Sequence, residues 1–110
     1  MYLDFSVGEK TYKLRLATRN IVALEKAIGK NPLSIFGSGD EIPEVTTMVT
    51  ILWASLQQYH HGISMDDAFS IFDKYLEEHT MTDFITTILD IYKVSGLIKS
   101  DKGTNEEKNV

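Results

Sequence analysis

The chain contains no cysteine among its 110 residues. Disulfides, thiol catalysis and thiolate metal sites are therefore excluded, which fits a reducing cytoplasm. The sequence also lacks the basic start and long apolar run of a secretory signal, and no stretch approaches the roughly 18 apolar residues of a membrane span. We therefore expect a soluble, cytoplasmic protein without a membrane partner.

Positive charge is scarce over much of the chain, whose net charge is -5. Residues 40–90 carry ten Asp and Glu residues against the single cation Lys74, whereas residues 1–30 carry six Lys and Arg against three anions. So acidic a surface repels phosphate backbones, and no nucleic-acid partner is expected. The acidic run can also consist of ordinary solvated helix faces.

The length allows one modest hydrophobic core, and the composition, 43% hydrophobic and 25% charged, is that of a globular protein. We expect a single domain over residues 1–98 with an α+β, mostly α fold. Residues 99–110 are polar and are expected to form a disordered tail.

Alternating apolar residues predict a β-hairpin over residues 2–16. They are Leu3, Phe5 and Val7 on one strand and Tyr12, Leu14 and Leu16 on the other, with residues 8–10 as the turn. Because two strands alone are marginal in water, the hairpin must pack on helices or extend its sheet through a partner. Its outer edge is thus a possible docking site.

Residues 18–96 are expected to form a compact bundle of about four to five helices. The first begins with Thr18 as its N-cap and ends at Gly29. Asn31 and Pro32 then start one short apolar turn, which stops at the glycines beginning with Gly37. These local signals predict a tight corner between the first helix and the next.

A central helix is predicted after Pro43. Its core stripe comprises Val45, Met48, Val49, Leu52, Leu56 and Tyr59, with Ile51 and Trp53 at the margins and Thr46, Thr47, Thr50, Gln57 and Gln58 opposite.

Two further helices are predicted by capping boxes, Ser64 with Asp67 and Thr80 with Asp83. The expected core residues are Ala68, Phe69, Phe72, Tyr75 and Leu76 in the first of these helices, and Phe84, Ile85, Ile88, Leu89 and Tyr92 in the second, which ends at residues 95–96.

No motif for catalysis or for binding a metal or a cofactor is found. His60 and His61 are adjacent, whereas a pair of metal ligands on a helix needs a spacing of three or four residues. Both are instead expected to cap the central helix, because a partly protonated imidazole stabilises the negative end of the helix dipole. Lys30 lacks the glycine and hydroxyl residues that a phosphate loop requires around it. We therefore expect no enzyme, although the three histidines leave a small enzyme or metal protein as an alternative reading.

The sequence resembles the small tail assembly chaperones of long-tailed phages and prophages of Gram-positive bacteria. The similarity spans about residues 2–98. Its most specific pieces are residues 24–25, residues 29–33 (GKNPL), residues 62–63, Asp66, Ala68, Asp73 and residues 82–84.

This resemblance implies a non-enzymatic protein that binds the tape measure protein and promotes assembly of tail tube subunits around it. It further implies action in the cytoplasm of the infected or lysogenic host and absence from the mature virion. The family often produces a longer form by a programmed frameshift near the end of the reading frame. A small structural virion component, such as a head-tail connector or tail protein, is the alternative.

An apolar groove between helices, rimmed by charge opposite to the client's, would suit an extended helical client. The candidate partner-binding residues are the acidic Asp66, Asp73 and Glu77 and the apolar Ile51, Trp53 and Ile71, although residues at stripe margins usually pack in the core. The opposed charges of the N-terminal and helical parts also suggest head-to-tail self-association.

Overall fold

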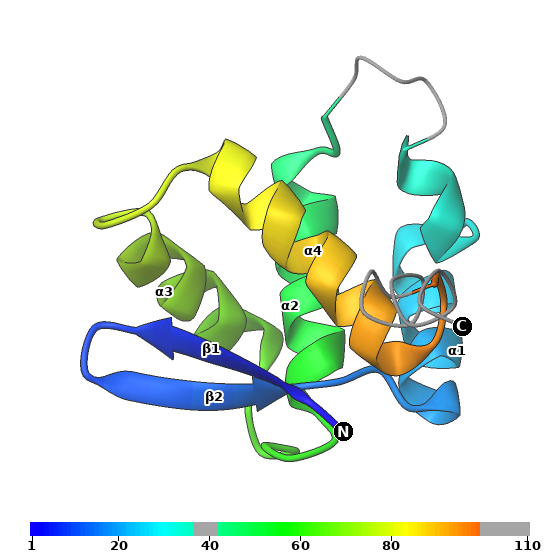
Figure 1. Cartoon of the computed structure of the whole chain (residues 1–110), viewed down its shortest axis with the longest axis horizontal. Coiled ribbons are helices and arrows are strands. Elements are labelled where there is room, and N and C mark those ends of the chain that lie inside the picture. Colours follow the sequence, from blue (N-terminus) through cyan, green and yellow to red (C-terminus); the bar gives the residue numbers. More distant parts are fainter. Residues whose placement is uncertain (37–41, 100–110) are drawn as a thin grey trace, which may run out of the picture.

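The structure is a computed structural model that describes residues 1–36 and 42–99. Within them, a two-stranded antiparallel hairpin precedes four α-helices and a short 3-10 helix (Figure 1). The elements are β1 (Leu3–Val7), β2 (Lys10–Leu14), α1 (Thr18–Ile28), the 3-10 helix η1 (Pro32–Phe36), α2 (Val45–Leu56), α3 (Met65–Tyr75) and α4 (Met81–Ser95). The predicted α+β, mostly α fold is confirmed.

Parts of two predictions lie outside the described residues. They are the stop at Gly37 and residues 100–110 of the expected polar tail. In the part of the chain that is described, no helix has the length and apolar character needed to cross a membrane.

The hairpin has a tighter turn than the sequence suggested. Val7 lies opposite Lys10, so only Gly8 and Glu9 form the turn, and Lys10 belongs to β2. Gly8 has a φ of 61°. A glycine in this conformation at the first turn position, followed by a residue of negative φ, is typical of a type II′ turn.

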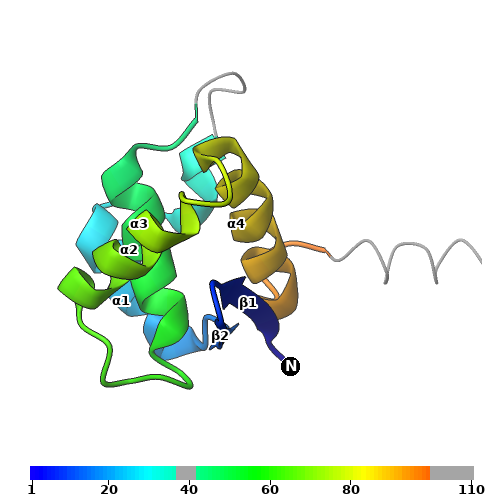
Figure 2. The same cartoon turned by 90° about the vertical axis from the view of Figure 1, so that its left-hand side faces the viewer.

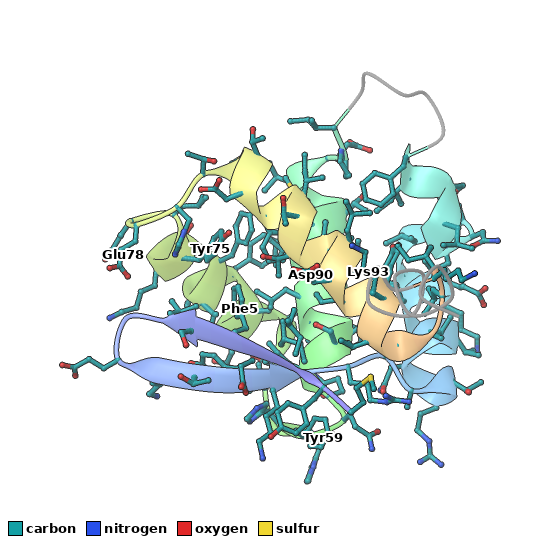
Figure 3. All side chains as sticks on the ribbon, viewed as in Figure 1. Phe5, Tyr59, Tyr75, Glu78, Asp90 and Lys93 are labelled. Carbon is teal, nitrogen blue, oxygen red and sulfur yellow. The ribbon has the colours of Figure 1, made fainter. Side chains whose placement is uncertain are left out.

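An aromatic cluster attaches the hairpin to α3 and α4. Phe5 of β1 lies 5.2 Å from Tyr75 and 6.0 Å from Phe84 between ring centroids. Phe72 contacts Phe84 edge to face at 5.0 Å. Figure 3 shows the rings of Phe5 and Tyr75 between β1 and α3. The hairpin is therefore stabilised by the burial of its apolar face on two helices, as the sequence required.

The helix α2 is central, as predicted, and it contacts α1, α3, α4 and β2. Figure 1 shows it in the middle of the molecule, behind α4. The prediction of a polar face was wrong in part, since Thr46 and Gln58 are exposed but Thr47 and Thr50 are buried, as is Ser55. The Thr50 hydroxyl donates to the carbonyl oxygen of Thr46, and that of Ser55 donates to Leu52. These bonds within the helix allow the two hydroxyls to be buried.

Some predicted core positions were also wrong. Val45 and Tyr59 are exposed, and Tyr59 lies beyond the end of α2 at Leu56. On α3, Phe69 is 41% exposed. Ile91 of α4 is buried although it was not predicted to be.

The helix boundaries follow most of the predicted caps. Both capping boxes form, and the αL conformation ends α1 at Gly29 and α4 at Gly96. Thr18 is not the N-cap of α1, because Ala17 holds that position and its N–H donates to the Asn20 side chain. Similarly, α2 begins at Val45, two residues after Pro43.

The corner after α1 is built as expected from its sequence. The side-chain oxygen of Asn31 accepts a hydrogen bond from the N–H of Leu33, and Pro32 begins η1. The carbonyl oxygen of Pro32 accepts a buried hydrogen bond from the Tyr92 hydroxyl. The corner is thereby joined to α4.

Candidate partner-binding site

The structure brings the three predicted acidic residues together but not the three apolar ones. Asp66 and Asp73 are exposed on α3, and Glu77 is exposed in the turn that follows it. Trp53 is half-buried on α2 and packs against the core. Ile51 is 0% exposed, so this candidate residue packs in the core, as residues at stripe margins usually do, and offers no surface to a partner. It is buried because α2 is surrounded on several sides rather than on one.

The outer face of α3 carries a row of exposed side chains. Asp66, Phe69 and Asp73 are spaced by three and four residues, which places them on one helix face. Glu77 continues the row after the helix ends. We call these four residues the α3 ridge. The core side of the same helix is formed by Ala68, Phe72 and Tyr75.

Phe69 is the member of the α3 ridge that sequence reasoning missed, because it was counted as a core residue. The sequence feature that could have identified Phe69 as exposed is its position around the helix. About 100° separates successive residues of an α-helix, so Phe69 lies toward the margin of the stripe formed by Ala68, Phe72 and Tyr75. The result is an exposed aromatic ring flanked along the helix by carboxylates, and aromatic rings are enriched at the centres of protein interfaces, whose rims are polar.

A pocket of about 420 Å³ lies between the hairpin and α3. Its lining includes Val7, Tyr12 and the predicted residue Ile71, with the charged side chains of Glu9, Lys10 and Lys74. Ile71 is half-buried and contributes to the wall of this pocket. The predicted setting was different, however, because this pocket is closed by the hairpin and bears two lysines rather than a purely acidic rim.

A second hollow, of about 500 Å³, follows the outer edge of β1. We call it the β1-edge groove. Asp4, Phe5 and Ser6 form one wall, and Tyr75, His79, Asp83, Thr86 and Thr87 form the other. Figure 2 shows β1 on the side of the molecule where α4 lies.

Ionisable groups cluster at one end of the β1-edge groove. An Asp83 carboxylate oxygen accepts a hydrogen bond from the backbone N–H of Thr80 and lies 3.9 Å from Nδ1 of His79. The His79 ring stacks on Tyr75 with 4.6 Å between centroids. Burial raises the pKa of the Tyr75 hydroxyl, and a hydrogen bond with Thr87 opposes that shift. The chemistry available here is hydrogen bonding and charge attraction.

His60 has a different role from the predicted one. It does not cap α2, which ends at Leu56; its Nε2 atom accepts a hydrogen bond from the backbone N–H of Lys13 in β2. Desolvation lowers the pKa of His60, and the nearby charge of Lys13 lowers it further. His60 therefore attaches β2 to the loop that leads to α3. Tyr59, labelled beneath the hairpin in Figure 3, adds a second contact, because its ring meets that of Tyr2 edge to face.

The described part of the chain contains no group of three or more His, Cys, Asp and Glu residues that could hold a metal ion. A family model described as "Family of unknown function (DUF6096)" matches residues 4–110. No curated protein and no solved structure matches the chain.

Proposed function

The chain belongs to DUF6096, a family of unknown function, and we propose that it is a non-enzymatic tail assembly chaperone of a long-tailed phage or prophage. In this proposal it binds the tape measure protein and promotes assembly of tail tube subunits around it. The resemblance of residues 2–98 to such chaperones supports the proposal. Its most compact piece, GKNPL at residues 29–33, forms the corner between α1 and η1.

The observation that carries the proposal is the α3 ridge. It presents three carboxylates around the exposed ring of Phe69 on a helix that is capped by Ser64 and packed through Phe72. A long helical client bearing positive charge would be attracted by the carboxylates and would cover the ring on binding. Because α3 is held by the core, the binding surface needs little ordering.

A matched pair of variants tests the ridge. Asp73→Lys reverses one charge on the ridge, and Glu25→Lys makes the same change on α1; both residues are exposed in the second half of their helices. Co-purification of the tape measure protein encoded beside this chain should fall with Asp73→Lys and persist with Glu25→Lys. Equal co-purification by both variants would contradict binding through the ridge.

The chaperone acts in the host cytoplasm and leaves before the particle is complete. Mass spectrometry of purified particles tests this step, because an assembly chaperone should be absent from them. Detection at a stoichiometric level would instead favour the alternative of a structural component such as a head-tail connector or tail protein.

Copies of the chaperone associate head to tail along the client in this proposal. The support is the excess of cations in residues 1–30 and of anions in residues 40–90. Association driven by these charges must weaken as salt screens them. Analytical ultracentrifugation should show oligomers that dissociate with added salt, whereas a salt-insensitive monomer at high concentration would contradict self-association.

A further inference from the structure

We propose that the outer edge of β1 binds an extended segment of a partner protein, bearing lysine or arginine, as a third antiparallel strand. This inference goes beyond the proposed function, because it specifies a strand-binding edge that is separate from the α3 ridge and does not depend on the identity of the client.

The register of the hairpin determines which backbone groups point outward. Val7 and Lys10 close a two-residue turn, so this pair exchanges hydrogen bonds between the strands. The pairs alternate from there, which leaves Asp4 and Ser6 with their N–H and C=O groups directed away from β2. These are the groups that an added strand requires.

The two edges of the hairpin differ in how they are covered. On β2 and just beyond it, the N–H of Lys13 donates to His60 and that of Arg15 donates to the carbonyl oxygen of Ser55. Across residues 1–36 and 42–99, no comparable hydrogen bond reaches the backbone of Asp4 or Ser6. The protein therefore covers one edge and leaves the other open, which is uncommon because open edges promote aggregation.

The β1-edge groove provides room beside this open edge. Asp4, Phe5 and Ser6 line it on the strand side, and Thr86 and Thr87 of α4 line the opposite side. The groove volume of about 500 Å³ is in the range of ordinary ligand pockets.

Charge favours a basic occupant. Asp4 lies on the strand side of the groove and Asp83 on the other side. Residues directly opposite in an antiparallel pair share a sheet face, so a lysine opposite Asp4 would place unlike charges together. A second copy pairing β1 with β1 would place no basic residue opposite Asp4, because β1 carries no lysine or arginine.

The test uses the full chain, labelled with ¹⁵N, and an acetylated and amidated hexapeptide of alternating lysine and valine. Amide hydrogen exchange at Asp4 and Ser6 should slow by about tenfold or more when the peptide is added, because their N–H groups become hydrogen-bonded. Unchanged exchange at these two amides with millimolar peptide would overturn the proposal. Slowing that increases with protein concentration in the absence of peptide would also overturn it, in favour of a second copy.

Two modified peptides test the predicted register. With lysines opposite Asp4 and Ser6, the lysine N–H groups point toward β1 and the valine N–H groups point away. N-methylation of the lysines should therefore abolish binding, whereas N-methylation of the valines should preserve it. Equal binding of the two methylated peptides would exclude strand addition.

A pair of protein variants tests the role of charge. Asp4→Asn should weaken binding of the lysine peptide several-fold, while Glu9→Gln makes the same charge change on the turn, outside the β1-edge groove, and should leave binding unchanged. Equal weakening by both variants would mean that net charge, rather than this groove, attracts the peptide.

Discussion

The hydroxyl of Tyr92 in α4 donates a hydrogen bond to the carbonyl oxygen of Pro32 across 2.9 Å. Both residues are buried, and the ring of Phe36 contacts that of Tyr92 edge to face. Burial also raises the pKa of Tyr92 far above its ordinary value. This contact joins the corner after α1 to the last helix, and the buried Pro32 and Ile35 attach the corner to the core.

Replacement of Tyr92 by phenylalanine should destabilise the protein by about 1–3 kcal/mol, because it leaves the buried carbonyl of Pro32 without its partner. Urea unfolding followed by circular dichroism measures the change. Tyr59→Phe removes a hydroxyl from an exposed ring and serves as the control, with little expected effect. A Tyr92→Phe variant as stable as the control would show that water or another group satisfies the carbonyl.

The protein should become less stable as the pH is lowered, because of His60. Its Nε2 atom must be unprotonated to accept the Lys13 N–H, and desolvation followed by the charge of Lys13 lowers its pKa in the folded state. The unfolded chain therefore binds a proton more readily, so the contribution is complete above about pH 6.5 and is lost as the pH falls through the folded pKa.

Urea midpoints at pH 7.5 and 5.5 test this dependence, since most carboxylates stay ionised between them. His60→Ala should reduce the difference in stability between the two pH values, whereas His61→Ala, at an exposed position, should retain it. A wild-type difference that survives in His60→Ala would assign the effect to another group.

The capping box of α4 should contribute measurably to stability. The Thr80 hydroxyl accepts from the N–H of Asp83, and the Asp83 carboxylate accepts from the N–H of Thr80. Thr80→Ala should cost about 0.5–2 kcal/mol, the usual range for loss of an N-cap. Thr82→Ala makes the same substitution two residues later at an exposed position. Equal unfolding free energies for the two variants would contradict a stabilising cap.

A side chain at Gly8 should lower the stability of the protein. Its φ of 61° is unfavourable for other residues, and a Cβ atom there would lie 2.9 Å from Cε of Lys74. Gly8→Ala should therefore cost about 1 kcal/mol or more. The double variant Gly8→Ala with Lys74→Ala removes the steric contact but keeps the backbone strain, so it should recover only part of the loss. Full recovery would assign the cost to Lys74 alone.

The features that could be predicted from the sequence are those with local causes. A capping box needs two residues three apart, as in Ser64 and Asp67, and a tight hairpin needs a glycine between two alternating strands. Asp66 and Asp73 of the α3 ridge were named as candidates from the acidic run, and helical spacing alone places them on one face, but Phe69 between them was counted as core.

The errors arose where tertiary contacts override local patterns. Thr47 and Thr50 belonged to a predicted polar face, yet both are buried because α2 is surrounded by other elements. Ile51, a candidate partner-binding residue, is buried for the same reason. The bond from Lys13 to His60 has no local signal, because its partners are far apart in the chain.

The β1-edge groove could be anticipated only in part. The alternation of apolar residues in the hairpin indicated an outer edge that a partner could extend. Which edge stays open is decided by His60 and Ser55, which cover β2, and by Thr86 and Thr87 of α4, which line the groove beside β1. Those contacts depend on the packed fold and not on the strand sequence.

Co-expression with a tape measure protein, the client in the proposed function, tests the central claim most directly. The quantity to measure is the fraction of tape measure protein that is soluble and co-purifies with a tagged form of this chain. The proposed chaperone function predicts that the tape measure protein is insoluble alone and becomes soluble and bound when the two are expressed together. A tape measure protein that stays insoluble and never associates with the chain would contradict it.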